Sequence, residues 1–150
     1  MIYLALKQDG PAGFWPRQFA ALTRWRLQTK YPHGGIVVTD DEGRNCELLH
    51  SNLANGLHAL PFSTQPGKGW TLLRLPESKA VEAKQRFSEL KGAKYDWFSL
   101  LAFALPLPFS DARRIYCFEW CWLVMTGVNP NFRVTPEMLL AKALELGDSA

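Results

Sequence analysis

The sequence has 150 residues, of which 47% are hydrophobic and 21% are charged, and its net charge is +3. This length and composition predict a single folded domain over residues 1–150 and exclude a disordered chain. The small net charge and the scattered Lys and Arg residues argue against a nucleic-acid-binding module.

The cysteine count and the apolar runs indicate where the protein resides. Three cysteines, an odd number, argue against a secreted disulfide framework. The first residues lack the basic region of a signal peptide. The longest apolar run, Trp97 to Leu107, contains Pro106 and is shorter than the ~20 residues that a membrane span needs. We therefore expect a cytoplasmic protein without a transmembrane segment.

The first half of the chain predicts one helix among several strands. Met1 to Leu6 alternates weakly, as a strand does, and aromatic residues between Trp15 and Thr29 recur at helical spacing. The β-branched run Gly34 to Thr39, the turn residues after it and the run Cys46 to His50 predict a β-hairpin. Two further strands are expected at Gly56 to Phe62 and Gly69 to Leu75.

The second half predicts helices. Pro76 to Lys91 has an apolar face and is followed by Gly92 as a stop. A very apolar helix is expected at Phe98 to Leu105, with Asp96 as its N-cap, and another at Tyr116 to Met125, stopped by Gly127.

A last helix, Glu137 to Leu146, has Thr135 as N-cap, Pro136 as first residue and Gly147 as C-cap. Strands joined by hairpins and flanked by helices indicate an α+β fold, with a small antiparallel sheet packed against helices. The tryptophans Trp25, Trp97, Trp120 and Trp122 are expected in the core.

Two histidines and one cysteine are the residues best suited to catalysis. His33 begins one strand of the predicted hairpin and His50 ends the other, so antiparallel pairing makes them neighbours. Cys117 stands at the start of an apolar helix, where free N–H groups and the helix dipole are expected to lower the pKa of a thiol. The same N–H groups can form an oxyanion hole. Cys117, His33 and His50 therefore predict a nucleophile, a base and an orienting group.

Other interpretations of these residues are structural or metal-binding. Cys46 and Cys121 are expected to be small buried hydrophobes. Cys117 and Cys121 are four residues apart and, with His33 and His50, form an alternative metal site, although their spacing matches no common zinc motif. Glu119 is expected to have a structural role at the helix start.

Longer stretches of the sequence resemble one protein family. RIYCFEWCWLVMTGVNPNFRVTPEML, which begins at Arg114, is similar to the cysteine helix of the permuted NlpC-like branch of papain-like enzymes. YPHGGIVV resembles the strand that carries the family's base, here His33, and LLHS resembles the end of the next strand, here His50. KYDWFSLLAF resembles a Tyr-Asp-Trp segment that precedes the cysteine helix. The histidine precedes the cysteine, as in the permuted branch.

The resemblance implies a circularly permuted papain-like fold of the NlpC type and a Cys117–His33–His50 site. Gly35 stands where many members carry a carboxylate, which makes His50 the best third member, with Glu47 and Asp40 as alternatives. Phe118 replaces the usual Ser after the cysteine.

The activity that the resemblance implies is covalent acyl-enzyme hydrolysis without a metal or organic cofactor. Its substrate would be a peptide or amide, including bacterial cell-wall peptides, so we expect a phage or bacterial cysteine peptidase or amidase. Two alternatives are an acyl-ester or thioester lipid hydrolase or acyltransferase of the same fold, and a non-catalytic structural or binding module on an inactive scaffold.

Overall fold

The structure is a computed structural model, and it describes residues 1–8, 18, 20, 21, 24, 25, 28–40, 42, 45–52, 54–63, 69–96 and 114–148. The predicted helix between Trp15 and Thr29 falls mostly outside these residues. The predicted helix at Phe98 to Leu105 falls outside them entirely, and so does Trp97.

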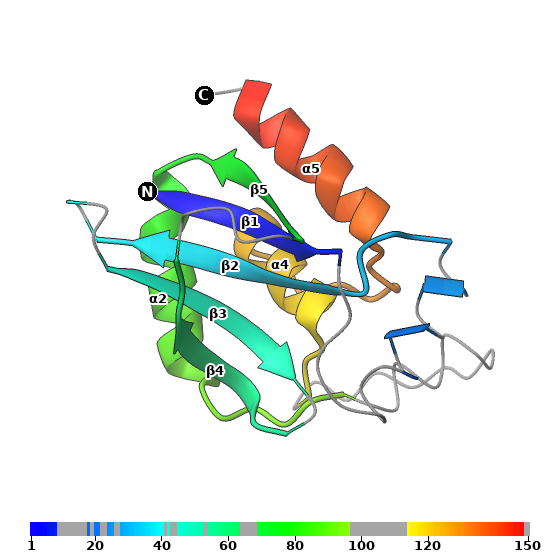
Figure 1. Ribbon diagram of the computed structural model, residues 1–150. Helices are drawn as coiled ribbons and strands as arrows, with labels where there is room; N and C mark the ends of the chain where they lie inside the picture. The colour runs from blue at the N-terminus through cyan, green and yellow to red at the C-terminus, as the bar shows by residue number, and fades with distance from the viewer. Residues whose placement is uncertain are drawn as a thin grey trace.

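The strands form one antiparallel sheet (Figure 1). Their order across the sheet is β4-β3-β2-β1-β5, and each strand runs antiparallel to its neighbours. All five strands predicted from the sequence are confirmed, including the hairpin of β2 and β3. The strands are β1 (Ile2–Lys7), β2 (His33–Thr39), β3 (Cys46–Asn52), β4 (Gly56–Pro61) and β5 (Trp70–Leu75).

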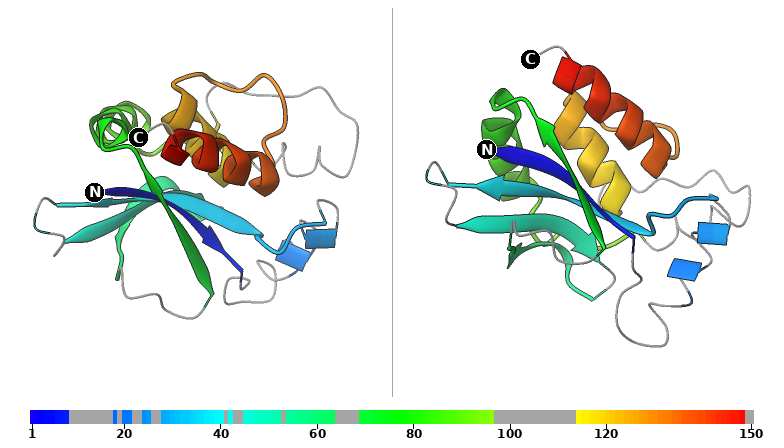
Figure 2. Two further views of the ribbon diagram at one scale, coloured as in Figure 1. Left: turned by 90° about the horizontal axis from the view of Figure 1, so that it is seen from above. Right: turned by 45° about the horizontal axis from the view of Figure 1, so that its top comes forward.

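The helices α2 (Ser78–Leu90), α4 (Cys117–Thr126) and α5 (Pro136–Asp148) lie on one side of this sheet (Figure 2, left). They correspond to three of the predicted helices, so the α+β prediction with an antiparallel sheet is confirmed. Residues Lys94 and Arg114 form an isolated bridge, which ties the end of the segment after α2 to the segment before α4.

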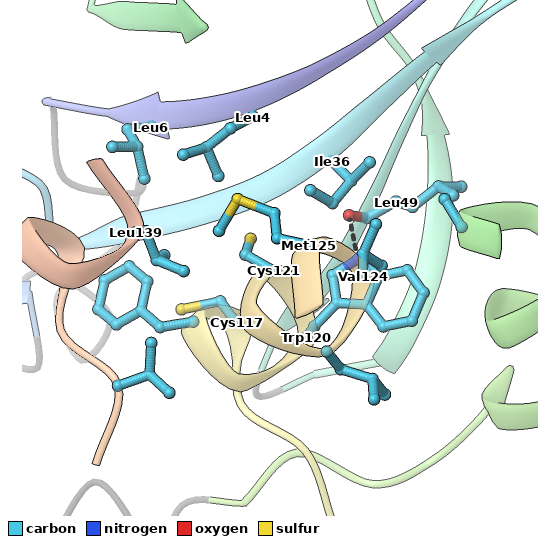
Figure 3. Close-up of a cluster of buried hydrophobic side chains, with 14 of the residues drawn as sticks. Leu4, Leu6, Ile36, Leu49, Cys117, Trp120, Cys121, Val124, Met125 and Leu139 are labelled. Carbon is cyan, nitrogen blue, oxygen red and sulfur yellow. Dashed lines mark hydrogen bonds between the residues drawn. The ribbon is translucent and has the colours of Figure 1, made fainter. Parts of the chain in front are cut away.

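Alternation along the strands gives the sheet two different faces. The face toward the helices, the helix face, carries the main core, in which Leu4, Ile36 and Leu49 pack against α4 (Figure 3). Trp120 of α4 is fully buried there, and its indole N–H donates to the carbonyl of Leu49 at 2.9 Å. The core prediction for Trp120 is therefore confirmed.

The opposite face carries a smaller apolar cluster of Ala5, Val37, Cys46 and Leu48, with Trp70 and Leu72 partly buried against it. The rings of His33, His50 and His58 contact one another or Trp70 at one end of this face. We call it the histidine face.

The helix ends follow the predicted signals with one exception. Gly92 and Gly127 have φ of 85° and 75°, the left-handed conformation in which glycine ends a helix. Thr135 caps α5, because its hydroxyl accepts from the backbone N–H of Met138 at 3.4 Å. The C-cap prediction for Gly147 is wrong: α5 continues to Asp148, and Gly147 keeps a negative φ.

Trp25 departs from the expected core, whereas Trp122 lies at its edge, partly buried against it. Trp25 is 75% exposed, so the prediction that it is buried is wrong. Helical spacing of apolar residues identifies a helix face but does not determine how completely each side chain is covered. Trp122 is half-buried and packs edge-to-face on Phe132, with ring centroids 5.3 Å apart.

Candidate active site

The start of α4 is fixed by hydrogen bonds on both sides of Cys117. The backbone N–H of Tyr116 donates to the Glu119 carboxylate at 3.2 Å, which is the return half of a capping box. The Tyr116 hydroxyl accepts from the backbone N–H of Val134 at 2.9 Å and donates to the Val134 carbonyl at 3.1 Å. Cys117 is thereby held as the first residue of α4, and Glu119 has the structural role predicted for it.

The thiol of Cys117 lies among hydrogen-bond donors although its residue is only 3% exposed. The backbone N–H groups of Gly34, of Phe118 and of Cys117 itself lower the pKa of the thiol, and so does the hydroxyl of Tyr95, so all of them lie near the sulfur. Figure 3 shows Cys117 and Cys121 within the apolar side chains of the helix face. The sulfur therefore combines an apolar shell with several donors that favour negative charge.

Burial dominates the acidity of this thiol. It raises the pKa of Cys117 to about 12, against the opposing hydrogen bonds from the Gly34 backbone and the Tyr95 hydroxyl. The expectation that the helix N-terminus lowers the pKa of Cys117 is therefore wrong for this state of the protein. Removing a thiolate from water costs more free energy than the helix dipole and the N–H groups gain by stabilising its charge.

The hairpin brings His33 and His50 together, as predicted. Nε2 of His33 lies 2.8 Å from Nδ1 of His50, and their ring centroids are 5.0 Å apart, edge to face. Burial lowers the pKa of His33 to about 3, with the charges of His50 and Lys7 as further causes. Burial also lowers the pKa of His50 to about 4, followed by the charges of His58 and Lys7. Both rings are neutral at pH 7, so one donates to the other.

Two glycines after His33 leave room for this arrangement. A Cβ on Gly34 would lie 3.1 Å from a methyl of Leu6 and 3.4 Å from the ring of Phe118, on the helix face. A Cβ on Gly35 would lie 2.7 Å from a methyl of Leu48 and 3.0 Å from Cβ of His50, on the histidine face. The sequence Gly34-Gly35 thus lets α4 approach one side of β2 and His50 the other.

Cys117 and His33 meet at the same strand end from opposite sides. The sulfur faces the backbone N–H of Gly34, which directly follows His33 in the chain. The imidazole of His33 instead contacts His50 and Trp70 on the histidine face. Among the hydrogen bonds of the described residues, none joins the sulfur of Cys117 to His33.

The alternatives for the third group lie elsewhere. Asp40 accepts from the backbone and side-chain nitrogens of Asn45, at 3.1 and 2.7 Å, in the turn of the hairpin. Glu47 is exposed and pairs with Val38, near the end of β2 that is remote from His33. His50 is the candidate that the structure places against His33.

The remaining cysteines lie in apolar surroundings, as predicted. Cys46 is 8% exposed, and Cys121 is fully buried. Within the part of the chain that the structure describes, no three His, Cys, Asp or Glu side chains gather as a metal site would require.

Sequence reasoning missed Tyr95 as a member of this site. Burial raises the pKa of Tyr95 well above the usual value, and the neighbouring Cys117 raises it further. The contact depends on the bridge between Lys94 and Arg114 and on the hydrogen bond from the Ile115 N–H to the Lys94 carbonyl at 3.1 Å. The one signal in the sequence is the Tyr-Asp-Trp segment of the resemblance.

No protein-family model matches the chain, and no curated protein matches it significantly. None of the described helices is both long enough and apolar enough to cross a membrane.

Proposed function

We propose that the chain is a cysteine hydrolase that cleaves amide or peptide bonds through an acyl-enzyme on Cys117. His33 is the general base and His50 orients it. The observation that carries the proposal is the placement of these three side chains. The thiol of Cys117 lies at the first residue of α4 and faces the backbone N–H of Gly34. Gly34 directly follows His33, whose imidazole is hydrogen-bonded to that of His50. These are the three roles that activate a weak nucleophile in acyl transfer.

We propose further that the fold is the circularly permuted, NlpC-type form of the papain-like fold. The support is the packing of α4, which begins with the cysteine, on an antiparallel sheet whose strand β2 begins with the histidine. The histidine precedes the cysteine in the chain, and a site of this kind is defined by geometry and not by chain order.

The proposed reaction starts from a neutral thiol and a neutral imidazole. Nε2–H of His33 donates to His50, which leaves Nδ1 of His33 to take the thiol proton as sulfur attacks the carbonyl carbon. Backbone N–H groups at the start of α4 stabilise the oxyanion. His33 then protonates the leaving nitrogen as the carbon–nitrogen bond breaks, and water hydrolyses the thioester. Substrate binding has to bring Cys117 and His33 within reach of each other, because no hydrogen bond joins them here.

Mass spectrometry of the acylated protein tests this proposal. After exposure to short acyl p-nitroanilides and p-nitrophenyl esters, we expect the acyl mass on the peptide that contains Cys117. Cys117→Ala should lose the adduct, and Cys121→Ala should keep it, because Cys121 is buried one turn further along the same helix. His33→Ala should slow acylation by about 10²- to 10⁴-fold.

The two probes also separate the substrate classes. Acylation by anilides supports the amidase, whereas acylation by esters alone supports the acyl-ester hydrolase or acyltransferase. An adduct that forms equally fast in His33→Ala, or no adduct on Cys117 with either probe, contradicts the proposal.

One observation favours a second candidate, a structural or binding module of a phage or bacterium on an inactive scaffold. Cys117 is 3% exposed, and burial raises the pKa of its thiol to about 12, which is the state of an inert cysteine. Under this candidate function, Cys117→Ala folds normally and changes no activity, and iodoacetamide modifies Cys117 no faster than Cys121 once the protein is native.

A further inference from the structure

A third imidazole stands beside the proposed base and orienting group. We propose that His58 is a positioning residue: its ring, fixed on β4 by Asn52 and Gly56, holds His50 in the orientation that presents Nδ1 to His33. The inference rests on the proposed function for its effect on rate, whereas the hydrogen bond between His33 and His50 can be tested on its own.

The first observation is the contact between the rings. His50 and His58 are direct partners across β3 and β4, and their ring centroids are 4.4 Å apart with a tilt of 46°. His33 meets His50 at 79°. The ring torsion of histidine is broad and roughly two-fold, so neighbouring side chains must select one orientation. His58 is packed closely enough on His50 to make that selection.

The second observation is that the turn before β4 fixes His58 itself. Nδ1 of His58 lies 2.9 Å from the carbonyl of Gly56, which can only accept, so Nδ1 carries the proton. The side-chain oxygen of Asn52 accepts from the backbone N–H groups of Ala54 and Asn55, at 3.0 and 2.8 Å. Its NH₂ group is therefore the donor that faces Nε2 of His58 at 3.4 Å. His58 is held as one tautomer in one orientation.

The third observation is that His50 has little else to hold it. Its Nε2 is buried and has no hydrogen-bond partner, and the residue is 6% exposed. The bond to His33 is thus the polar contact of this ring, and a half-turn about the ring torsion would point Nδ1 away from His33. Because Nε2 offers no bond that would resist that half-turn, the resistance has to come from the bond to His33 and from the packing of the His58 ring.

The charges around the pair agree with a neutral, hydrogen-bonded state. His50 is faced by Lys7 from β1, by His33 from β2 and by His58 from β4. The charge of Lys7 is among the causes that lower the pKa of both His33 and His50. A neutral pair can adopt either of two tautomeric arrangements, so an orienting neighbour has a measurable consequence.

Nitrogen NMR of the imidazoles in the full-length protein tests the proposal. His58→Ala removes the ring, and His58→Phe keeps a ring of similar packing. Leu60→Ala is the control, because Leu60 lies two residues along the same strand and is 42% exposed. We expect wild type, His58→Phe and Leu60→Ala to show one fixed tautomer at His33 and His50. His58→Ala should show averaged ring shifts at both and acylate Cys117 about tenfold more slowly.

Two results would overturn the proposal: unchanged tautomers in His58→Ala, or averaging in His58→Phe equal to that in His58→Ala. If His58→Ala does not fold, Asn52→Ala frees the ring without removing it, and the same averaging is expected. Averaged shifts in His58→Ala together with no acylation in wild type would support the role of His58 and contradict the proposed hydrolase.

Discussion

The two faces of the sheet differ in the charge that burial opposes. On the helix face, burial raises the pKa of Cys117 to about 12 and of Glu119 to about 8, so negative charge is disfavoured. On the histidine face, burial lowers the pKa of His33 to about 3 and of His50 to about 4, so positive charge is disfavoured. A thiolate–imidazolium pair would need both charges at once. The site is therefore neutral on both sides of β2.

The largest expected effect is a loss of stability, and it differs between the two faces because they are packed differently. Trp120→Ala should destabilise the protein by about 4 kcal/mol, because it empties a fully buried site and removes the donor to Leu49. Leu72→Ala, on the histidine face, should cost about 1 kcal/mol because its side chain is only half-buried. Urea denaturation of both variants measures the difference. Equal losses would show that the histidine face is as tightly packed as the helix face.

Acid should weaken the protein through the histidine face. The pKa values of His33 and His50, about 3 and about 4, lie below the value of ~6.5 for an unfolded chain, so the unfolded state binds more protons in between. The histidine contribution to stability is therefore full above ~6.5 and falls as the pH drops, by about 3 kcal/mol for the two groups together at pH ~5.5. Urea unfolding across this range checks the slope. The double variant His33→Gln, His50→Gln should lose most of it, and an unchanged slope would contradict the assignment.

Substitutions at two neighbouring glycines of β2 probe the packing of the two faces at one point, because a Cβ at Gly34 would point to the helix face and one at Gly35 to the histidine face. Gly35→Ala should cost about 2 kcal/mol, because its Cβ would meet Cβ of His50 and the carbonyl of Leu49 at 3.0 and 3.1 Å. Gly34→Ala should cost about 1 kcal/mol, since the nearest atom is a methyl at the end of the Leu6 side chain. Thermal unfolding ranks the two. In Gly35→Ala we also expect a weakened His33–His50 hydrogen bond in the imidazole spectrum.

Raising the pH from ~4.3 to about 8 should weaken the helix face by a modest amount. Burial and then the charge of Asp96 raise the pKa of Glu119 to about 8, above its unfolded value of ~4.3. Its contribution is full below that unfolded value and is lost as the pH rises through about 8, which costs about 1–2 kcal/mol for a half-buried group. Glu119→Gln keeps an acceptor for the Tyr116 N–H and should flatten this decline. A decline as steep as that of wild type would contradict the prediction.

Local patterns predicted most of the fold. The β-branched run before Asp40, the turn and the run after Asn45 predicted the hairpin, because strand periodicity and turn chemistry are properties of adjacent residues. Gly92 and Gly127 predicted helix ends for the same reason. Gly147 shows what a local pattern cannot predict. A glycine of this kind ends a helix where its backbone adopts the left-handed conformation, and the residue type alone does not say whether it will.

The candidate site was predictable only in part. The hairpin alone brings His33 to His50, so their contact followed from the sequence. The hydroxyl of Tyr95 reaches Cys117 through the pairing of two segments separated by a stretch outside the described residues, which no local pattern encodes. The pKa of Cys117 also depends on total burial, a tertiary property, and burial outweighed the helix N-terminus on which the prediction relied.

The position of β1 has a consequence for the order of folding. β1 lies between β2 and β5, although β5 begins only at Trp70. The strands β2, β3 and β4 form a meander of close neighbours in sequence, whereas the β1–β5 pairing closes a much longer loop. Loop closure of this length slows folding, so the meander is expected to form early and the β1–β5 pairing late. The contact of His33 with Trp70 of β5 would then form in the last stage of assembly.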